Sequence, residues 1–338
     1  MVRVIKVKRL FLFLALPCVL AVAALWYVVD YIEASVATPI PLAAAQLIQL
    51  EKGSSAQTLI STLKRQQIIE HPLWVKVWLK LHPELSRVKA GVYEIAPGMS
   101  LQAFWQKVVE GQEKQFSVSL IEGHTWQMWL AHLRQQPQLS NVDASESEIL
   151  NGIPDYNCKP LEGQLLPDTY HFVAGTPLSQ VVARAYKHLW DFMQDAWLQR
   201  DANLPYSTPY EALIMASIIE KETGQADERG MIAGVFVNRL EKRMRLQTDP
   251  TVIYGLGPNF NGNLTKADLR RLTPYNTYRI NGLPPGPIAM PGKAAILAAL
   301  HPTTTAALYF VARGDGSHVF SDTLAEHNAA VRKYQLKK

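Results

Sequence analysis

Two carboxylates at the end of an apolar stretch are the side chains best suited to acid–base chemistry. Residues 212–219 contain a single polar side chain, Ser217, and Glu220 and Glu222 follow directly. A carboxylate among apolar groups has a raised pKa, because desolvation disfavours its charged form. Such a carboxyl group can keep its proton near neutral pH and act as a general acid. The other interpretation is an ordinary helix-end glutamate that is solvated or paired with an arginine.

The segment that positions these carboxylates is predicted to be a helix. Pro209 suits the first helical position, and Thr208 and Glu211 have the spacing of a capping box. The apolar residues lie on nearly every side, which predicts a helix buried in the protein core. Side chains two positions apart on a helix diverge by roughly 200°. We therefore do not expect Glu220 and Glu222 to act as a pair.

Other polar side chains gather in three segments rich in turn residues. The segments are 161–170, 244–255 and 275–287, each with glycine or proline. Loops on a rigid scaffold carry much of a protein's binding chemistry. For 244–255, a turn in which threonine and aspartate bond their own backbone is an equally good interpretation.

The N-terminus has the composition of a membrane anchor. The 20 residues Leu10–Val29 carry no charge, and Arg3, Lys6, Lys8 and Arg9 precede them. Twenty apolar residues can span a hydrocarbon core of roughly 30 Å. The basic flank predicts a cytoplasmic N-terminus, with everything after the span outside. A cleaved signal peptide or a lipoprotein cysteine at Cys18 is the alternative, but the apolar run is long for the first and Pro17 does not suit the second.

Charge and cysteine content exclude several classes of function. Of the net charge of +5, the four basic residues of the tail account for all but +1. The predicted exported part is nearly neutral, so it has no basic surface for nucleic acid. The two cysteines, Cys18 and Cys158, form neither a disulfide framework nor a zinc-binding spacing. We therefore expect no metal and no cofactor.

The order of predicted elements gives an α+β protein with four parts. The parts are a tail and transmembrane anchor (1–30), a linker (31–45), a small αβ module (46–115) and a mixed helical and β catalytic domain (116–338). The module has a strand, two helices and a strand, the order of a carbohydrate-binding LysM module. Trp74 and Trp78 lie on one of its helices, where core packing competes with sugar stacking as their role.

The large domain is predicted to contain long helices and one hairpin. Helices are expected at 125–135, 177–199, 229–239 and 294–300 and after Thr323, and hairpin strands at 308–312 and 318–320. The polar residues 136–155 are expected to form an exposed excursion. His318 and His327 have no metal-ligand spacing, so we interpret them as structural.

Several of these segments together resemble the YceG-like (MltG) family of endolytic murein transglycosylases. The resemblance covers about residues 161–328 and is most specific in the segment from Arg245 to Gly255. At 164–166 the chain has Gln-Leu-Leu, where the family more often has an aromatic residue before Pro167. The matching motifs are Leu161-Glu162-Gly163, Pro167-Asp168-Thr169-Tyr170, residues 216–223, Val237-Asn238-Arg239-Leu240, residues 245–255, Tyr275-Asn276-Thr277-Tyr278, residues 282–286 and Phe310-Val311-Ala312.

The resemblance implies an enzyme of the bacterial cytoplasmic membrane that cleaves peptidoglycan glycan strands on the periplasmic side. It implies cleavage of the β-1,4 bond between N-acetylmuramic acid and N-acetylglucosamine, with 1,6-anhydro ends as products. Glu220 corresponds to the catalytic acid. Whether the enzyme works alone or with glycan-synthesis enzymes, and whether it terminates nascent strands, stays open. Sugar contacts are expected from Gln247, Asp249, Asn276, Tyr275, Tyr254 and Glu162.

Two alternatives belong to other classes. A muramidase would hydrolyse the same bond, and it would normally need two carboxylates roughly 5–9.5 Å apart. A non-catalytic glycan-binding protein of the envelope would use the LysM-like segment and would not depend on Glu220.

Overall fold

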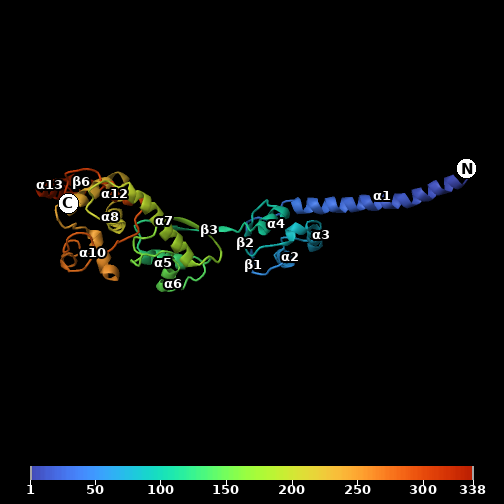
Figure 1. Ribbon diagram of the computed structural model, residues 1–338, viewed down its shortest axis with the longest axis horizontal. Helices are drawn as coiled ribbons and strands as arrows, with labels where there is room; N and C mark the ends of the chain where they lie inside the picture. Colours follow the sequence, from blue (N-terminus) through green and yellow to red (C-terminus); the bar gives the residue numbers. More distant parts are fainter. Residues whose placement is uncertain (1, 337–338) are drawn as a thin grey trace. The chain divides into compact units, whose positions relative to one another are not determined.

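The computed structural model describes the backbone of residues 2–336 and the side chains of residues 16–336. The chain divides into two compact units, Met1–Phe116 and Ser117–Lys338 (Figure 1). Both units combine helices with short two-stranded sheets. The predicted α+β class with an N-terminal apolar helix is therefore confirmed.

The chain begins with a long apolar helix, α1 (Val2–Ala37). Within its described side chains, Leu16–Ala37 has a mean hydropathy of 1.6 and is long and apolar enough to cross a membrane. A signal sequence near an N-terminus would meet the same criteria. The predicted basic flank at residues 3–9 lies outside the described side chains.

Helix α1 continues through the first part of the predicted linker. Residues 31–37 are helical, and Ile32 and Val36 are buried in the core of the first unit. His82 Nε2 lies 2.7 Å from Glu33 Oε1, which adds a polar contact to this packing. The interpretation of residues 31–37 as linker was wrong, because the apolar residues of the last two turns have a core to pack against.

The rest of the first unit has the predicted order of strand, two helices and strand. These elements are β1 (Gln46–Leu50), α2 (Ala56–Arg65), α3 (Pro72–Leu81) and β2 (Gly91–Ile95), and α4 (Leu101–Glu110) follows. Strands β1 and β2 pair antiparallel, with Gln46 opposite Ile95. Trp78 is a core residue in edge contact with Trp105, whereas Trp74 is only partly buried. Sugar binding by this unit stays a prediction.

Helix α8 (Pro209–Glu222) lies at the centre of the second unit. Thr208 Oγ1 accepts the Glu211 N–H at 3.2 Å, and the Glu211 carboxylate accepts the Thr208 N–H, which confirms the capping box. All residues from Ala212 to Ile219 are buried. They pack against α7 (Leu178–Leu198), α9 (Arg229–Glu241), α10 (Asp249–Leu256) and α12 (Lys293–Leu300). The predicted core helix is confirmed.

The other elements of the second unit surround this core. Strand β3 (Gln115–Leu120) pairs with β4 (Asp168–Val173), and β5 (Tyr309–Ala312) forms the predicted antiparallel hairpin with β6 (His318–Ser321). Helix α13 (Leu324–Tyr334) packs against this hairpin. The remaining helices are α5 (Trp126–Arg134), α6 (Glu146–Asn151) and α11 (Lys266–Arg270).

Two segments predicted as irregular contain helices. The polar excursion 136–155 includes α6, which buries Ile149. The segment 244–255 is a loop only as far as Thr248, because Pro250 lies in the first turn of α10. Proline is well suited to this position, since its missing N–H would have no partner there. The prediction of a loop over the whole of 244–255 was therefore wrong for residues 249–255, where Pro250 favours the start of a helix.

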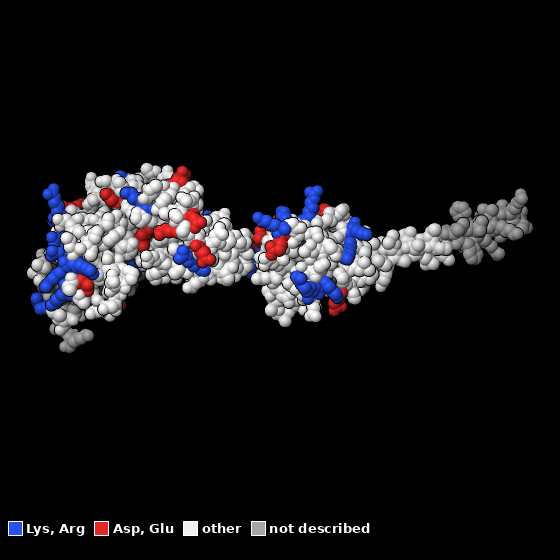
Figure 2. All heavy atoms as spheres, turned by 90° about the horizontal axis from the view of Figure 1, so that it is seen from below, with Lys and Arg blue, Asp and Glu red and all other residues white. Residues whose placement is uncertain are grey.

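Charged side chains of both signs occur on each unit. On the face shown in Figure 2, both units carry lysine and arginine side chains as well as aspartate and glutamate side chains. This agrees with the nearly neutral charge of the chain after its basic tail.

Candidate active site

The end of α8 directs its two carboxylates toward different surroundings. Glu220 Oε2 accepts the backbone N–H of Gly292 at 2.9 Å, whereas Glu222 Oε1 accepts the hydroxyl of Thr248. These partners come from two different segments that follow α8 in the sequence, one directly before α12 and one directly before α10. The predicted divergence of the two side chains is thus observed.

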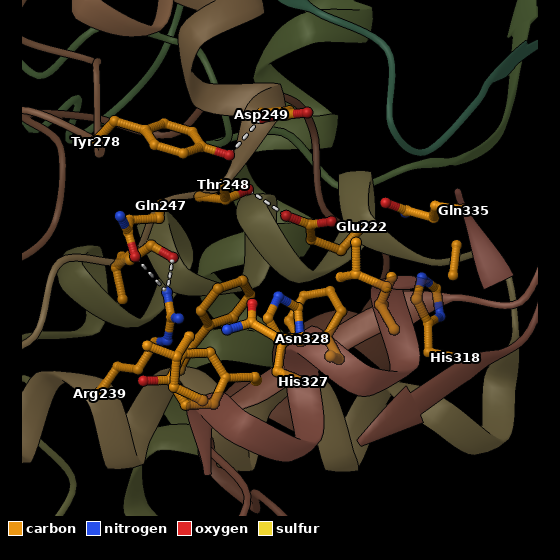
Figure 3. A pocket seen from close by; sticks show the side chains of 18 residues that line it. Glu222, Arg239, Gln247, Thr248, Asp249, Tyr278, His318, His327, Asn328 and Gln335 are labelled. Atoms are coloured by element: carbon orange, nitrogen blue, oxygen red, sulfur yellow. Dashed lines mark hydrogen bonds between the residues drawn. The ribbon is translucent and has the colours of Figure 1, made fainter. Parts of the chain in front are cut away.

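Glu222 borders a cavity of about 530 Å³ (Figure 3). Its walls come from the ends of α8 and α9, the segment before α10, the β5–β6 hairpin and α13. Polar groups occupy much of this wall. They are Glu222, Arg239, Gln247, Thr248, Asp249, Tyr278, His318, His327, Asn328 and Gln335.

The surroundings of Glu222 favour its protonated form. Burial is the main cause that raises its pKa, and the nearby charge of Asp249 adds to it. The hydrogen bond from Thr248 and the charge of His318 act in the opposite direction. The net result is a pKa of about 7. A carboxyl group with this pKa can both give and take a proton near neutral pH.

Glu220 is also enclosed, but it does not border this cavity. Burial raises its pKa, while the Gly292 N–H and the Arg229 guanidinium lower it. Arg229 Nη2 lies 3.9 Å from Glu220 Oε1, and the Glu220 side chain is 7% exposed. Its carboxylate joins the end of α8 to the start of α12, whereas the Glu222 carboxylate is bonded to the segment before α10.

Gln247 and Asp249 lie beside Glu222 in the cavity wall. Gln247 has a φ of 52°, in the left-handed region that few side chains adopt. Its backbone N–H is bonded to Thr277 O at 3.2 Å, which holds this conformation. Asp249 Oδ1 accepts the hydroxyl of Tyr278 at 2.6 Å. Both predicted sugar-contact residues are exposed and near Glu222, so they can meet a ligand in the cavity.

Arg239 organises the floor of the cavity. Its guanidinium is buried and donates to the backbone carbonyls of Leu308, Arg245 and Leu246, at 2.7, 3.1 and 2.7 Å. These carbonyls belong to the start of the hairpin and to the loop before α10. One side chain of α9 thereby fixes two segments that carry cavity residues.

Glu162, Tyr254 and Tyr275 form a separate cluster outside this cavity. Both Glu162 oxygens accept the N–H of Trp126, at 3.1 and 3.2 Å, and Oε2 also accepts the Tyr254 hydroxyl at 3.3 Å. The rings of Tyr254 and Tyr275 lie 4.8 Å apart. Burial raises the pKa of Glu162 to about 7. The three predicted contact residues are together, but they do not line the cavity of Glu222.

Asn276 has a structural role in place of the predicted sugar contact. It is fully buried, and its side-chain amide donates to the carbonyls of Asp268, Leu269 and Arg271. Its Oδ1 accepts the N–H of Tyr278 at 2.9 Å. Because both the nitrogen and the oxygen of this buried side-chain amide are bonded to backbone groups, the amide is not available to bind a ligand.

Several of the polar groups around Glu222 are not among the site residues predicted from the sequence. Tyr278 and Arg239 belong to motifs of the family but have no predicted role, and His318 and His327 are predicted to be structural. Their proximity to α8 depends on segments far along the chain. Among the described residues, no group of three or more His, Cys, Asp or Glu side chains is placed to hold a metal ion.

Comparison with known proteins places this arrangement in a family. The profile of the YceG-like family matches residues 48–333. A protein of Bacillus subtilis strain 168, named endolytic murein transglycosylase, is 35% identical over 306 residues, which cover 85% of this chain and 84% of that protein. A protein of the same name from Streptococcus pneumoniae strain R6 is 27% identical, and the match covers 85% of this chain and 58% of that protein.

A solved structure agrees with the sequence relatives. The crystal structure of a YceG-like protein from Listeria monocytogenes is 31% identical and has a TM-score of 0.55. The match covers 85% of this chain and 98% of that one.

Proposed function

The chain belongs to the YceG-like family, and we propose that it is a membrane-anchored endolytic murein transglycosylase. The relatives in Bacillus and Streptococcus carry that name, which supports a lytic transglycosylase activity on peptidoglycan for this chain. The substrate bond would be the β-1,4 bond between N-acetylmuramic acid and N-acetylglucosamine inside a glycan strand.

The observation that carries the chemistry is a buried carboxyl group at the end of α8. Glu220, which the sequence resemblance selects, is 7% exposed, and burial raises its pKa. We therefore propose Glu220 as the catalytic acid. Glu222, which borders the cavity together with Gln247 and Asp249, is the alternative.

One carboxyl group is sufficient for the lytic reaction. Protonated Glu220 donates its proton to the glycosidic oxygen, and the bond from that oxygen to C1 of the muramyl residue breaks. The muramyl O6 then forms a bond to C1, and its proton passes to the Glu220 carboxylate. The acid is restored, the leaving sugar has a new hydroxyl and the muramyl end is 1,6-anhydro, so no water is consumed.

The neighbours of Glu222 would hold the sugars. Gln247 and Asp249 are exposed at the cavity wall and can bond hydroxyl and N-acetyl groups. The Tyr278 hydroxyl orients the Asp249 carboxylate. Tyr254, Tyr275 and Glu162 would act outside the cavity, along a longer glycan strand.

The anchor and the first unit would set where the reaction occurs. Leu16–Ala37 is compatible with a single membrane span, and the basic tail favours a cytoplasmic N-terminus with the catalytic unit in the periplasm. The LysM-like order of β1, α2, α3 and β2 supports glycan binding by the first unit. Cleavage near the membrane would suit termination of nascent strands beside glycan-synthesis enzymes.

The two glutamates provide a matched pair of variants that tests the assignment. We expect Glu220→Gln to lower the rate of anhydro-product formation from purified glycan strands by at least about a hundredfold, since general acid catalysis contributes 10²–10⁴-fold. Glu222→Gln should retain more than about a tenth of the rate. Mass spectrometry of the products measures both rates. The opposite ranking of the two variants would identify Glu222 as the acid.

A muramidase is the second candidate, because Asp249 gives the cavity a second carboxylate. A hydrolase adds water, so its products are heavier than anhydro products by one water molecule. The same mass spectra separate the two reactions. A non-catalytic glycan-binding protein would show no new ends in wild type or in either variant.

A further inference from the structure

Helix α3 of the first unit leaves an apolar stripe exposed. The buried residues of α3 lie on one side and face the core of the unit. Leu73, Val77 and Leu81 recur at every fourth position on the other side, where Leu73 is 64% and Leu81 is 45% exposed. Lys76 and Lys80 are exposed beside this stripe, and α3 contains no acidic residue. An apolar stripe flanked by lysines is typical of a helix that lies in the interface of a bilayer.

Two contacts hold α3 across the end of α1. The rings of Trp74 and Tyr31 meet edge to face, with their centroids 6.1 Å apart, and His82 Nε2 lies 2.7 Å from Glu33 Oε1. Eight positions separate Trp74 from His82, which is about 12 Å of helix. The two α1 residues are only about 3 Å apart along their helix and point to nearly opposite sides of it. Helix α3 therefore crosses α1 and does not run alongside it.

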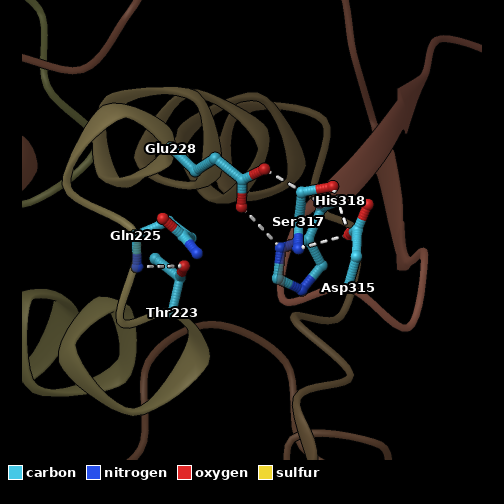
Figure 4. A network of polar contacts seen from close by, with 6 residues as sticks. All are labelled: Thr223, Gln225, Glu228, Asp315, Ser317 and His318. Carbon is cyan, nitrogen blue, oxygen red and sulfur yellow. Dashed lines mark hydrogen bonds and ion pairs between the residues drawn. The ribbon is translucent and has the colours of Figure 1, made fainter.

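A histidine–glutamate contact of this kind also joins two segments of the second unit. There Glu228 Oε2 lies 2.7 Å from His318 Nδ1, and the other oxygen accepts the His318 N–H at 2.8 Å (Figure 4). Those two side chains are enclosed, with exposed fractions of 16% and 12%. His82 and Glu33 are each 37% exposed, so their contact lies at the surface of the first unit. It fixes the angle between α3 and α1 at the place where α1 leaves the core.

The boundary of the proposed membrane span falls at the level of these contacts. The uncharged residues of the span end at Val29. Aromatic side chains gather at the level of lipid headgroups, and Trp26 and Tyr27 are mostly exposed there. Tyr31 follows Val29 by two positions, which is about 3 Å along the helix. Its ring contact with Trp74 therefore brings the start of α3 to the headgroup level.

The exposed stripe of α3 is on the side of the first unit from which α1 projects. The core on the other side of α3 includes Ile32 and Val36, which follow Tyr31 along α1. Figure 1 shows α3 at the end of the unit that faces the N-terminal part of α1, and Figure 2 shows lysine and arginine side chains at that end. The positive charge of Lys76 and Lys80 complements anionic phospholipid headgroups.

We propose that α3 is an interfacial helix, with Leu73, Val77 and Leu81 among the lipid chains just below the headgroups and Lys76 and Lys80 on anionic phosphate groups. The surface that it binds is the bilayer that α1 spans. The proposal rests on the membrane anchor of the proposed function and adds a second attachment to it. A helix across the bilayer and a helix along its surface together fix the height and the tilt of the first unit.

Quenching by brominated lipids tests this contact in the full-length chain. A bimane label is placed at the native Cys18, at Leu73→Cys or at Leu47→Cys, and the remaining native cysteines are replaced by serine. Each protein is reconstituted as one copy per nanodisc of equal parts phosphatidylcholine and phosphatidylglycerol. Leu47 is the matched control, because it is an exposed leucine on β1 of the same unit. We expect the labels at positions 18 and 73 to lose fluorescence and the label at position 47 to keep it, since interfacial helices bury their apolar side by about 5–10 Å.

Bromination of one lipid at a time measures the preference of α3 for anionic lipid. Each lysine near an anionic surface contributes about 1 kcal/mol, which is about fivefold in affinity. Lys76→Gln combined with Lys80→Gln should therefore lower the preference for phosphatidylglycerol at position 73 by about 5–25-fold. Lys52→Gln combined with Lys89→Gln removes the same charge from exposed positions outside α3 and should leave the preference unchanged.

The labels distinguish failure of this proposal from failure of the proposed anchor. Quenching at position 18 without quenching at position 73, or equal quenching at positions 47 and 73, would overturn the interfacial helix. A label at position 73 that is shielded only in discs with two copies would assign the stripe to a second copy of the chain. A lipid preference that survives the change of both Lys76 and Lys80 would contradict binding of anionic headgroups. An unquenched label at position 18 would contradict the anchor itself and is recognised without reference to α3.

Discussion

At the scale of residues, burial sets the protonation of the carboxyl groups in the catalytic unit. Glu162 and Glu222 both have a pKa of about 7, because their surroundings disfavour the charged form. Glu228 has a lowered pKa because His318 compensates for its burial. Glutamates of the same chemistry thus differ in charge at neutral pH because their surroundings differ.

Glu162 provides a prediction about stability. Its pKa is raised from the ordinary value of 4.5 to about 7, so the folded protein holds a proton that the unfolded chain releases between these values. Stability must therefore fall as pH rises through this window. We expect Glu162→Gln to be more stable than wild type at pH 8 by roughly 1–3 kcal/mol, with little difference at pH 4. Urea unfolding in detergent at both pH values measures this.

The control for this variant is an exposed glutamate. Glu241→Gln, at the end of α9, should change stability equally little at both pH values. An advantage of Glu162→Gln that is the same at pH 4 and pH 8 would mean that titration of Glu162 does not cause it.

At the scale of elements, α8 determines where the proposed acid lies. Its buried residues fix the rotation of the helix, and its capping box fixes where it begins. From Pro209 the helix runs to Glu222, so its C-terminal turn meets the loop before α10 at Thr248. The cavity lies beside the end of a helix in which every residue from Ala212 to Ile219 is buried.

The capping box gives a prediction at this scale. Thr208→Ala removes the acceptor for the Glu211 N–H and should lower the unfolding free energy by roughly 1–2 kcal/mol. Turnover below the melting temperature should stay unchanged, because the cap is at the opposite end of α8 from Glu220. Thermal unfolding and product assays measure the two effects.

Helix α11 provides the matched control. Thr265 and Asp268 form the same capping box, but this helix has no buried residue. Thr265→Ala should therefore lower the unfolding free energy by less than Thr208→Ala does. Equal losses of unfolding free energy in the two variants would mean that the α8 cap stabilises only the local turn of the helix.

At the scale of the whole molecule, the membrane-compatible helix is continuous with a folded core. Helix α1 supplies Ile32 and Val36 to the core of the first unit. The membrane-compatible segment and the unit therefore share one element, which is helical from Leu16 to Ala37. The first unit is thereby held at a fixed place relative to α1.

The shared core gives a further prediction. Ile32 is fully buried, so Ile32→Ala should lower the stability of the first unit by roughly 2–5 kcal/mol. Leu73 is in the same unit and is 64% exposed, so Leu73→Ala should lower the stability of the unit by less than about 1 kcal/mol. Tryptophan fluorescence during unfolding follows the change, since Trp78 and Trp105 lie in that core. An equal effect of the two variants would mean that α1 does not pack in this core.

Much of the local structure could be predicted from the sequence. Thr208, Pro209 and Glu211 define the start of α8, and the apolar run after them defines a buried helix. The α+β class, the hairpin at 309–321 and the divergence of Glu220 and Glu222 also follow from spacing and periodicity. These features depend on neighbours within a few positions, where backbone geometry is the same in every protein.

The functional arrangement was decided by tertiary structure. Thr248 and His318 are 26 and 96 positions from Glu222, yet packing of α10 and β6 brings both beside it. The same packing buries Asn276 and places Glu162 in a separate cluster. Periodicity places both glutamates at the end of one helix, but only the segments that fold against that helix decide the surroundings of each carboxylate.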